Sequence, residues 1–163
     1  MKRILLCRHA KAEKARPGVD DRERVLEDRG VQDAARVATL LAEEPVERVY
    51  ASSAPRAAET ARLLFPGREV EYVDALYPGS GEGYLRFIQG LPDEYGYVAL
   101  VGHNPAMEEC VRFLVGREVV LKTSWCALVV CEVEGWRECD GKRKGRLAWV
   151  AMPEGLRGSA DGG

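Results

Sequence analysis

The sequence predicts an α/β fold in three layers, with a mostly parallel central sheet, helices on both faces of the sheet and an antiparallel edge. Through residue 114, short apolar runs typical of buried strands alternate with segments whose apolar residues recur at helical spacing. Beyond that point, two strand-like runs flank a turn rich in Gly and Lys. The alternation predicts parallel pairing, and the two late runs predict the antiparallel edge.

Each predicted element follows from its local pattern. Apolar runs predict strands at residues 3–7, 46–51, 69–73, 97–101, 127–133 and 146–151. Helical spacing of apolar residues predicts helices at residues 30–43, 55–65, 84–90 and 105–114. Asn104 is predicted to be the N-cap of the last helix, with Pro105 in its first turn. The charged segment 16–28 and the Gly-rich segment 77–83 are predicted to be loops.

The composition is that of an ordinary globular protein, with 46% hydrophobic and 31% charged residues. We expect a single domain over residues 1–154 and a disordered tail over residues 155–163, which are small and polar. The formal net charge of −2 argues against binding to nucleic acid or to an anionic membrane. No apolar stretch approaches the roughly 20 residues of a membrane span, and the start at Met1 is too short for a signal peptide.

The five cysteines form no CxxC pair, and the sequence holds no Walker or HExxH motif. We therefore expect buried, reduced thiols in a cytoplasmic protein, with no metal site. The five residues are Cys7, Cys110, Cys126, Cys131 and Cys139.

Two histidines occur in the chain, and each follows a predicted strand. His9 comes after the first strand and directly after Arg8, whereas His103 comes after the fourth strand and before a predicted helix start. Arg56 lies in the first turn of the helix that follows the second strand. Because ligands of open α/β sheets gather at the carboxyl ends of strands, we expect these four side chains to share one site.

The residue types of this site favour phosphate chemistry. Helix N-termini and Arg side chains both bind phosphate oxygens. Cations beside His9 would lower its pKa, which would keep one ring nitrogen unprotonated and able to attack phosphorus. A backbone carbonyl is expected to fix the tautomer through the other nitrogen. The pattern thus predicts phosphoryl transfer that needs no metal and no cofactor.

Four segments resemble those of the histidine phosphatase superfamily, in particular its small phosphohistidine phosphatase branch, the SixA-like proteins. Residues 8–10 (Arg-His-Ala) resemble the superfamily's Arg-His-Gly signature, and residues 24–30 resemble the branch's Arg-Pro-Leu-Thr-x-x-Gly segment. Residues 52–61 resemble its Ser-x-x-x-Arg-Ala-x-x-Thr-Ala segment, and residues 101–105 its Gly-His-Asn-Pro segment. The resemblance implies a phosphoglycerate mutase-like fold and a phosphohistidine intermediate.

By this resemblance, His9 is the phosphorylated nucleophile, and Arg8, Arg56 and His103 form the phosphate pocket. Val25 and Glu27 replace the Pro and Thr of the second segment, so Arg24 carries over only as a phosphate or substrate contact. Further candidate substrate-binding residues are Ser53, Asp74 and Asn104.

Larger members of the superfamily place a carboxylate near the pocket as a general acid, and the candidates here are Asp74 and Glu82. Protonation by such an acid raises the rate at which an alkoxide leaves by roughly 10²–10⁴-fold, whereas an imidazole can leave without a strong acid. We therefore expect the substrate to be a phosphohistidine on a partner protein. The alternatives are a general phosphomonoesterase for small molecules and a non-catalytic module that binds phosphate or a phosphoprotein. The expected oligomeric state is a monomer or weak dimer.

Overall fold

A computed structural model of the chain describes residues 1–142 and 145–158. Within this part, seven strands form one sheet in the order β3-β2-β4-β1-β5-β6-β7. The strands are β1 (Lys2–Arg8), β2 (Arg48–Ser52), β3 (Val70–Val73), β4 (Tyr97–Gly102), β5 (Cys126–Cys131), β6 (Gly145–Met152) and β7 (Gly155–Gly158). The first four strands pair in parallel, and β5, β6 and β7 continue the sheet in antiparallel pairing. The predicted α/β architecture is therefore confirmed.

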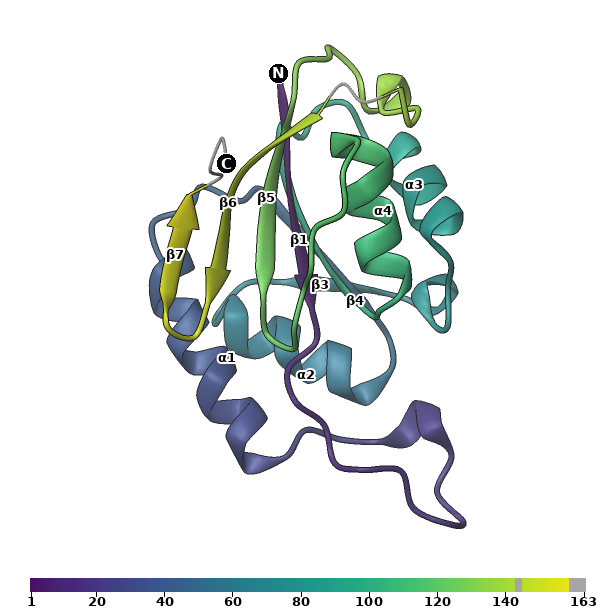
Figure 1. The fold of residues 1–163 in the computed structure, drawn as a ribbon, viewed down its shortest axis with the longest axis vertical. Helices are drawn as coiled ribbons and strands as arrows, with labels where there is room; N and C mark the ends of the chain where they lie inside the picture. Colours follow the sequence, from purple (N-terminus) through teal and green to yellow (C-terminus); the bar gives the residue numbers. More distant parts are fainter. Residues whose placement is uncertain (143–144, 159–163) are drawn as a thin grey trace.

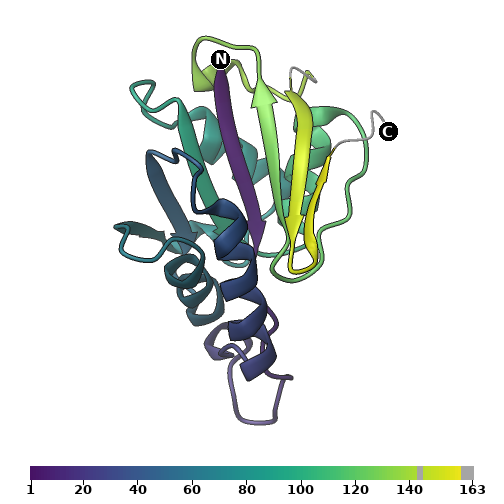
Figure 2. The same ribbon diagram turned by 90° about the vertical axis from the view of Figure 1, so that its left-hand side faces the viewer.

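Helices cover both faces of the sheet (Figures 1 and 2). Two of them, α1 (Asp28–Leu41) and α2 (Pro55–Leu64), pack together on one face. The other two, α3 (Gly81–Gln89) and α4 (Ala106–Val115), pack together on the opposite face. The three layers seen in the two views agree with the predicted arrangement.

Strand β1 explains why the core has two halves. Its side chains alternate across the sheet, as in any strand. Ile4 and Leu6 belong to the cluster beneath α3 and α4, whereas Leu5 and Cys7 belong to the cluster beneath α1 and α2. All four are fully buried, which is why this strand is a continuous apolar run and not an alternating one.

Three helix starts differ from their predicted positions. Helix α1 begins at Asp28, two residues before its predicted start. Helix α3 begins at Gly81, because the Ser80 side chain accepts a hydrogen bond from the Gly83 amide and caps the helix (3.0 Å). The predicted loop at 77–83 is therefore shorter. Asn104 is not the N-cap of α4, since Pro105 holds that position. The Asn104 Oδ1 atom still accepts a hydrogen bond from the Glu108 amide (3.3 Å), one turn into the helix.

The tail prediction is wrong for residues 155–158, which form β7 and pair with β6. A turn at residues 153–154 reverses the chain, and Gly155 leaves it with a φ of +140°, a conformation that favours glycine. Residues 159–163, which the same prediction covers, lie outside the described residues. Two further findings concern the whole chain as described. All five cysteines are buried, and none of the described helices has the length and apolar character needed to cross a bilayer.

Candidate active site

The register of the parallel strands brings the two histidines together. Arg8 is the last residue of β1, Gly102 is the last residue of β4, and these two residues are paired across the strands. The next residue along each chain segment is a histidine. The His9 amide donates to the Gly102 carbonyl (2.9 Å), and the imidazole centroids of His9 and His103 lie 5.2 Å apart.

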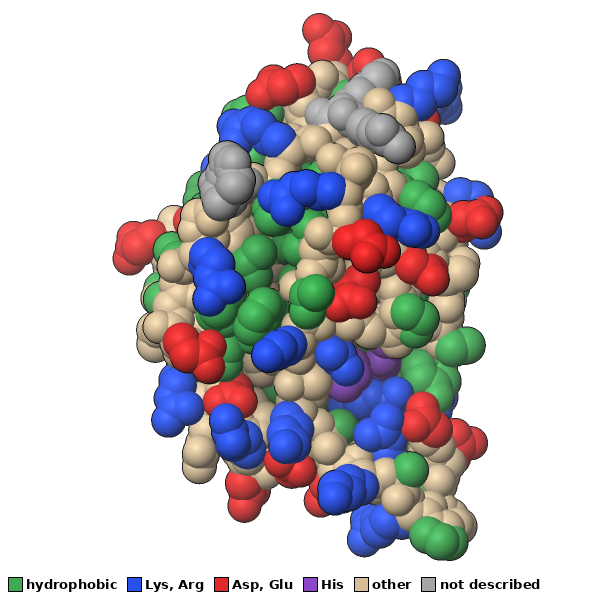
Figure 3. All heavy atoms as spheres, viewed as in Figure 1, with side chains coloured by type: hydrophobic (Ala, Val, Ile, Leu, Met, Phe, Trp, Pro, Cys, Tyr) green, Lys and Arg blue, Asp and Glu red, His purple; other side chains and the backbone are tan. Residues whose placement is uncertain are grey.

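Both rings lie in a cavity of about 420 Å³. Figure 3 shows them as purple side chains in a recess bordered by blue Lys and Arg side chains. Arg56, in the first turn of α2, and Arg8 line the same cavity. The structure thus brings together the four residues that the sequence predicts for one site. The lining also includes Lys11, Asp21, Arg24, Tyr77, Asn104 and Thr123.

His9 is held with one ring nitrogen available for chemistry. Its Nδ1 lies 2.7 Å from the Ala10 carbonyl oxygen. A carbonyl oxygen has no proton, so Nδ1 must be the donor, and Nε2 carries the lone pair. Burial lowers the pKa of His9 to about 4; Arg56 and Arg8 add to this effect, and the hydrogen bond to Ala10 opposes it. The ring is therefore neutral at pH 7.

A buried threonine ties this segment to α2. The Thr60 hydroxyl accepts from the Ala10 amide (2.9 Å) and donates to the Arg56 carbonyl (2.7 Å). This one side chain links the residue that follows His9 with the first turn that carries Arg56. Thr60, one helical turn after Arg56, therefore fixes the distance between the segment that carries His9 and the helix turn that carries Arg56.

His103 is also neutral and buried. Its Nε2 lies 2.9 Å from the Ser52 hydroxyl at the end of β2. Burial lowers the pKa of His103 to about 3, with the neighbouring His9 and Arg56 acting in the same direction. The ring of Tyr77 meets the His103 ring edge to face, at 5.1 Å between centroids.

The glycine before His103 is required by close packing. A Cβ atom at Gly102 would lie 2.6 Å from the hydroxyl oxygen of Tyr84. That hydroxyl accepts from the His103 amide (3.1 Å) and donates to the Leu76 carbonyl (2.8 Å). Glycine at this position lets Tyr84 reach the end of β4 and hold the His103 peptide in place.

The two arginines are fixed by hydrogen bonds that leave part of each guanidinium unpaired. Arg8 donates from Nη1 to the Leu121 carbonyl (3.1 Å). Arg56 donates from Nη1 to the Asp21 carbonyl (2.7 Å) and from Nη2 to the Asp21 carboxylate (3.1 Å). Nε of Arg8, Nε of Arg56 and Nδ1 of His103 are buried without a hydrogen-bond partner among the described residues. Because buried polar atoms are nearly always paired, three such atoms around one cavity indicate a site for a polar, anionic ligand.

Asp21 and Tyr77 are among the lining residues that sequence reasoning missed. Asp21, in a 3₁₀ turn at Asp21–Glu23, lines the cavity and pairs with Arg24 (Nε to Oδ1, 2.9 Å) as well as with Arg56. The Tyr77 hydroxyl donates to Asp21 Oδ2 (2.6 Å). This hydrogen bond and the two arginines lower the pKa of Asp21 to about 2. In the sequence, the spacing of Asp21 and Arg24 within the charged loop was the pattern that could have pointed to this part of the site.

The other candidates have different positions. Arg24 and Asn104 line the cavity, and each also makes a local bond, Arg24 to the Glu13 carbonyl and Asn104 to the Leu121 carbonyl (both 2.9 Å). Ser53 and Asp74 lie outside the lining, where the Ser53 hydroxyl donates to Asp74 and accepts from Arg22 (2.7 Å).

The two candidate acids are displaced for a topological reason. Asp74 follows β3, the edge strand, which is separated from β1 by β2 and β4. Its side chain is 93% exposed and faces Arg22 at 3.8 Å. Glu82 lies on α3, is 77% exposed and pairs with Arg86 (3.9 Å). Neither carboxylate reaches the cavity lining.

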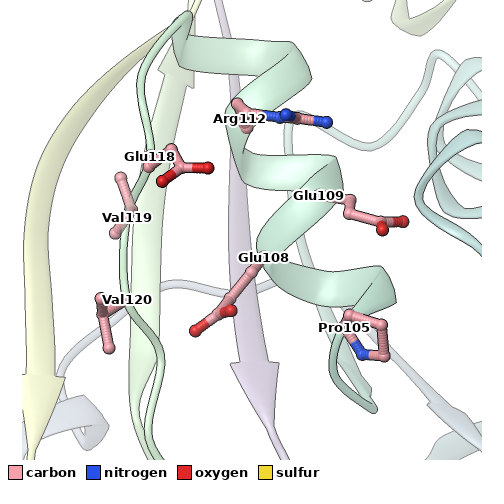
Figure 4. A pocket seen from close by; sticks show the side chains of 7 residues that line it. All are labelled: Pro105, Glu108, Glu109, Arg112, Glu118, Val119 and Val120. Carbon is pink, nitrogen blue, oxygen red and sulfur yellow. The ribbon is translucent and has the colours of Figure 1, made fainter.

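A second cavity adjoins the first at Pro105 but has the opposite charge (Figure 4). Glu108, Glu109 and Glu118 line it with a single cation, Arg112. Glu108 accepts from the Leu121 amide (2.7 Å) and Glu109 accepts from the Gly81 amide (3.0 Å). An anion would be repelled here, so an anionic ligand fits the first cavity and not this one. Among residues 1–142 and 145–158, no group of three His, Cys, Asp or Glu side chains is arranged to hold a metal ion.

Comparisons with known proteins point in the same direction. The family model for the histidine phosphatase superfamily (branch 1) matches residues 4–77. An uncharacterized chloroplastic protein of Arabidopsis thaliana is 26% identical over 152 residues, which cover 84% of this chain and 70% of that protein.

Solved structures of SixA proteins share the fold. The SixA protein from Agrobacterium tumefaciens is 28% identical, with a TM-score of 0.75 over 91% of this chain and 97% of that one. The SixA protein described from Nakamurella multipartitia is 22% identical, with a TM-score of 0.80 over 98% and 97% of the two chains. A SixA structure complexed with tungstate is 23% identical, with a TM-score of 0.75 over 93% and 97%.

Proposed function

We propose that this chain is a phosphatase of the histidine phosphatase superfamily and that it removes the phosphoryl group from phosphohistidine on a partner protein through a phosphorylated His9. The observation that carries the proposal is the state of His9. Its Nε2 is unprotonated, because Nδ1 donates to the Ala10 carbonyl, and the ring lies among Arg8, Arg56 and His103.

The first step transfers the phosphoryl group to the enzyme. The Nε2 lone pair of His9 forms a bond to phosphorus while the bond from phosphorus to the substrate nitrogen breaks, and that electron pair stays on the substrate nitrogen. Arg8 and Arg56 donate to the equatorial oxygens through their unpaired Nε groups. His103 contributes a further polar contact through Nδ1.

The second step hydrolyses the phosphoenzyme. Water attacks phosphorus on the side opposite His9, the bond to Nε2 breaks, and inorganic phosphate leaves. His9 returns to its neutral form with the proton still on Nδ1. In both steps the two guanidiniums supply the positive charge, and we propose that no metal ion takes part.

The cavity lining favours a phosphoramidate over a phosphate ester. An ester expels an alkoxide and needs a proton donor. Asp21 is the acidic residue of the lining in the described part of the chain, and its pKa of about 2 keeps it ionised at neutral pH. Asp74 and Glu82 point to solvent. A leaving imidazole, which departs as a neutral molecule, fits a site without a protonated carboxyl group.

The comparison with SixA supports the same substrate. One of the SixA structures with this fold holds tungstate, a tetrahedral oxyanion related in shape to phosphate. We propose that the cavity between His9 and Arg56 takes such an oxyanion in this chain. We also propose that the protein acts in the cytoplasm, where its five buried cysteines remain thiols.

The test is to follow labelled phosphate from a phosphohistidine peptide. Wild type should release phosphate and carry a transient label that is labile in acid and stable in alkali. His9→Ala should carry no label and release no phosphate above background. Because the chain has two histidines, peptide mapping assigns the label without ambiguity. Label on His9→Ala equal to that on wild type would contradict the proposal.

The small-molecule alternative is examined with the same preparations. We expect kcat/KM for the phosphohistidine peptide to exceed that for a sugar phosphate, and Asp74→Asn to leave both values unchanged, since Asp74 lies outside the cavity. A preference for the sugar phosphate that depends on Asp74 would favour a general phosphomonoesterase.

A further inference from the structure

Asp21 is an anion placed inside a cationic site. The cavity lining holds Arg8, Lys11, Arg24 and Arg56, and Asp21 is its acidic member within the described residues. Such a carboxylate opposes the binding of the phosphoryl group, because like charges repel across a partly desolvated cavity. Its presence therefore calls for a physical explanation.

Holding Arg56 in place does not explain the carboxylate. The main-chain carbonyl of Asp21 already accepts a hydrogen bond from Arg56 Nη1 at 2.7 Å, shorter than the 3.1 Å bond to the carboxylate. Arg56 also lies over the ring of Tyr77, 5.4 Å from its centroid. An uncharged residue at position 21 would still accept the hydrogen bond from Arg56 Nη1 through its main-chain carbonyl. It would also leave Arg56 over the ring of Tyr77.

Asp21 is also fixed at the site by a neutral donor. The Tyr77 hydroxyl donates to Asp21 Oδ2 (2.6 Å), and the Tyr77 ring packs edge to face against His103 (5.1 Å). This chain of contacts holds the carboxylate next to the reacting groups. The side chain is still 52% exposed, so it lies on the open side of the cavity, from which a substrate on another protein has to enter.

The leaving group of the proposed reaction carries a positive charge before it departs. A phosphohistidine ring is a good leaving group only when its second nitrogen is protonated, because the ring then leaves as neutral imidazole and not as the strongly basic imidazolate. In the transfer step, one unit of positive charge therefore disappears from the substrate ring and appears on the ring of His9. A carboxylate beside the substrate ring would keep that proton in place.

We propose that Asp21 is the specificity-determining residue of this phosphatase, and that it accepts a hydrogen bond from the protonated ring nitrogen of the substrate phosphohistidine. This inference rests on the proposed function and names the leaving group that the site selects. The proton stays on the substrate ring throughout, the phosphorus–nitrogen bond breaks toward that ring, and no proton passes through Asp21. Substrates with an anionic leaving group are disfavoured by the same charge.

The test compares Asp21→Asn with wild type on two substrates, one with a neutral leaving group and one with an anionic leaving group. With a phosphohistidine peptide, kcat/KM should fall by roughly 10- to 100-fold, the value of one hydrogen bond to a charged group. With p-nitrophenyl phosphate, which expels an anionic phenolate, kcat/KM should rise by roughly twofold to fivefold as the repulsion is removed. The ratio of kcat/KM for the phosphohistidine peptide to kcat/KM for p-nitrophenyl phosphate should therefore fall.

Asp20→Asn is the matched control. It removes one negative charge from the neighbouring residue, which caps the same 3₁₀ turn by accepting from the Arg22 amide (3.0 Å) and does not line the cavity. Asparagine can also accept that hydrogen bond. The ratio of the two kcat/KM values should equal that of wild type.

Two further measurements separate this role from a purely structural one. The alkaline limb of the pH profile with phosphohistidine should move to lower pH in Asp21→Asn, because the substrate ring loses its proton more easily. Inhibition by orthophosphate should become tighter. Parallel losses on both substrates, or weaker inhibition by phosphate, would show that Asp21 merely holds Arg56 and would overturn the proposal. The requirement for His9 would remain testable in either outcome, so the two proposals fail separately.

Discussion

The imidazole rings of His9 and His103 lie 5.2 Å apart, tilted by 58°, and each is held by a neutral group. His9 donates to the Ala10 carbonyl, and His103 contacts the Ser52 hydroxyl. A carboxylate in either position would raise the pKa of the ring. With neutral partners, burial dominates and both rings remain uncharged. In the proposed mechanism His9 gains a positive charge when it is phosphorylated, and a neutral His103 adds no repulsion to that charge.

The fork geometry of Arg56 should matter more than its charge. Arg56→Lys keeps one positive charge but loses the planar pair of donors, so we expect kcat/KM to fall by roughly 10- to 100-fold. Arg62→Lys is the control on the same helix, where Arg62 contacts the Tyr72 hydroxyl at the surface (3.0 Å). Steady-state kinetics on phosphohistidine peptide gives the comparison. Equal activity of the two variants would argue against phosphate binding by Arg56.

The acid side of the pH–rate profile should report the neutral state of His9. A nucleophilic ring must be unprotonated, and burial lowers the pKa of His9 from 6.5 to about 4. We therefore expect kcat/KM to hold between pH 7 and 5 and to fall only as the pH approaches 4, because this parameter follows the free enzyme. An acid limb centred near 6.5 would mean that the ring titrates as an ordinary exposed histidine.

Stability should depend on pH for the same reason. The unfolded chain binds protons on both histidines below about pH 6.5, whereas the folded chain resists protonation down to about pH 4 for His9 and about pH 3 for His103. Between these values the unfolded state holds more protons, so the free energy of unfolding falls as the pH is lowered. Urea unfolding at pH 7 and pH 5 measures the loss. His103→Asn should show a smaller loss than wild type.

The central part of the site was predictable because it depends on strand ends. His9 and His103 follow β1 and β4, and once these are recognised as parallel neighbours their last residues must meet at one edge. Arg56 follows from the same logic, since the helix after β2 starts at that edge. Local patterns of apolar residues were sufficient for this part of the structure.

The remaining parts depend on contacts between distant segments. Asp21 lies in a loop whose path is set by Arg56 and Tyr77, and neither contact leaves a periodic signal in the sequence. Asp74 was overvalued because the strand order was unknown: its strand, β3, turns out to be the edge strand and lies away from β1. Segment β7 was missed because a four-residue strand of Gly, Leu and Arg lacks an apolar run.

Gly30 shows how the second family segment acts through structure. A Cβ atom there would collide with the Lys11 carbonyl, which accepts a hydrogen bond from the Glu27 amide (3.0 Å). Glycine thus lets the start of α1 pack against the chain just after His9. The segment departs from the family pattern at Val25 and Glu27. Its last residue, Gly30, nevertheless allows the close packing against Lys11.

Chelation should leave the activity intact. The lining side chains Arg8, Lys11, Arg24 and Arg56 already supply positive charge in the cavity, so we expect equal kcat with phosphohistidine peptide before and after dialysis against EDTA. Adding Mg²⁺ or Zn²⁺ should not raise the rate. A loss of activity on chelation that a single metal restores would contradict the proposed mechanism.

Tyr84 should support His103 from behind without contacting the substrate. Its hydroxyl is bonded to the His103 amide and the Leu76 carbonyl, and burial raises its pKa to about 12. Tyr84→Phe leaves both backbone groups unpaired, so the free energy of unfolding should fall by about 1–3 kcal/mol. Since Tyr84 positions the peptide that carries His103, kcat should decrease while KM changes little. The control is Tyr72→Phe at the surface, where a change within about 0.5 kcal/mol is expected. Equal stability and kcat of the two variants would show that the contact to the His103 amide has no role in holding the site.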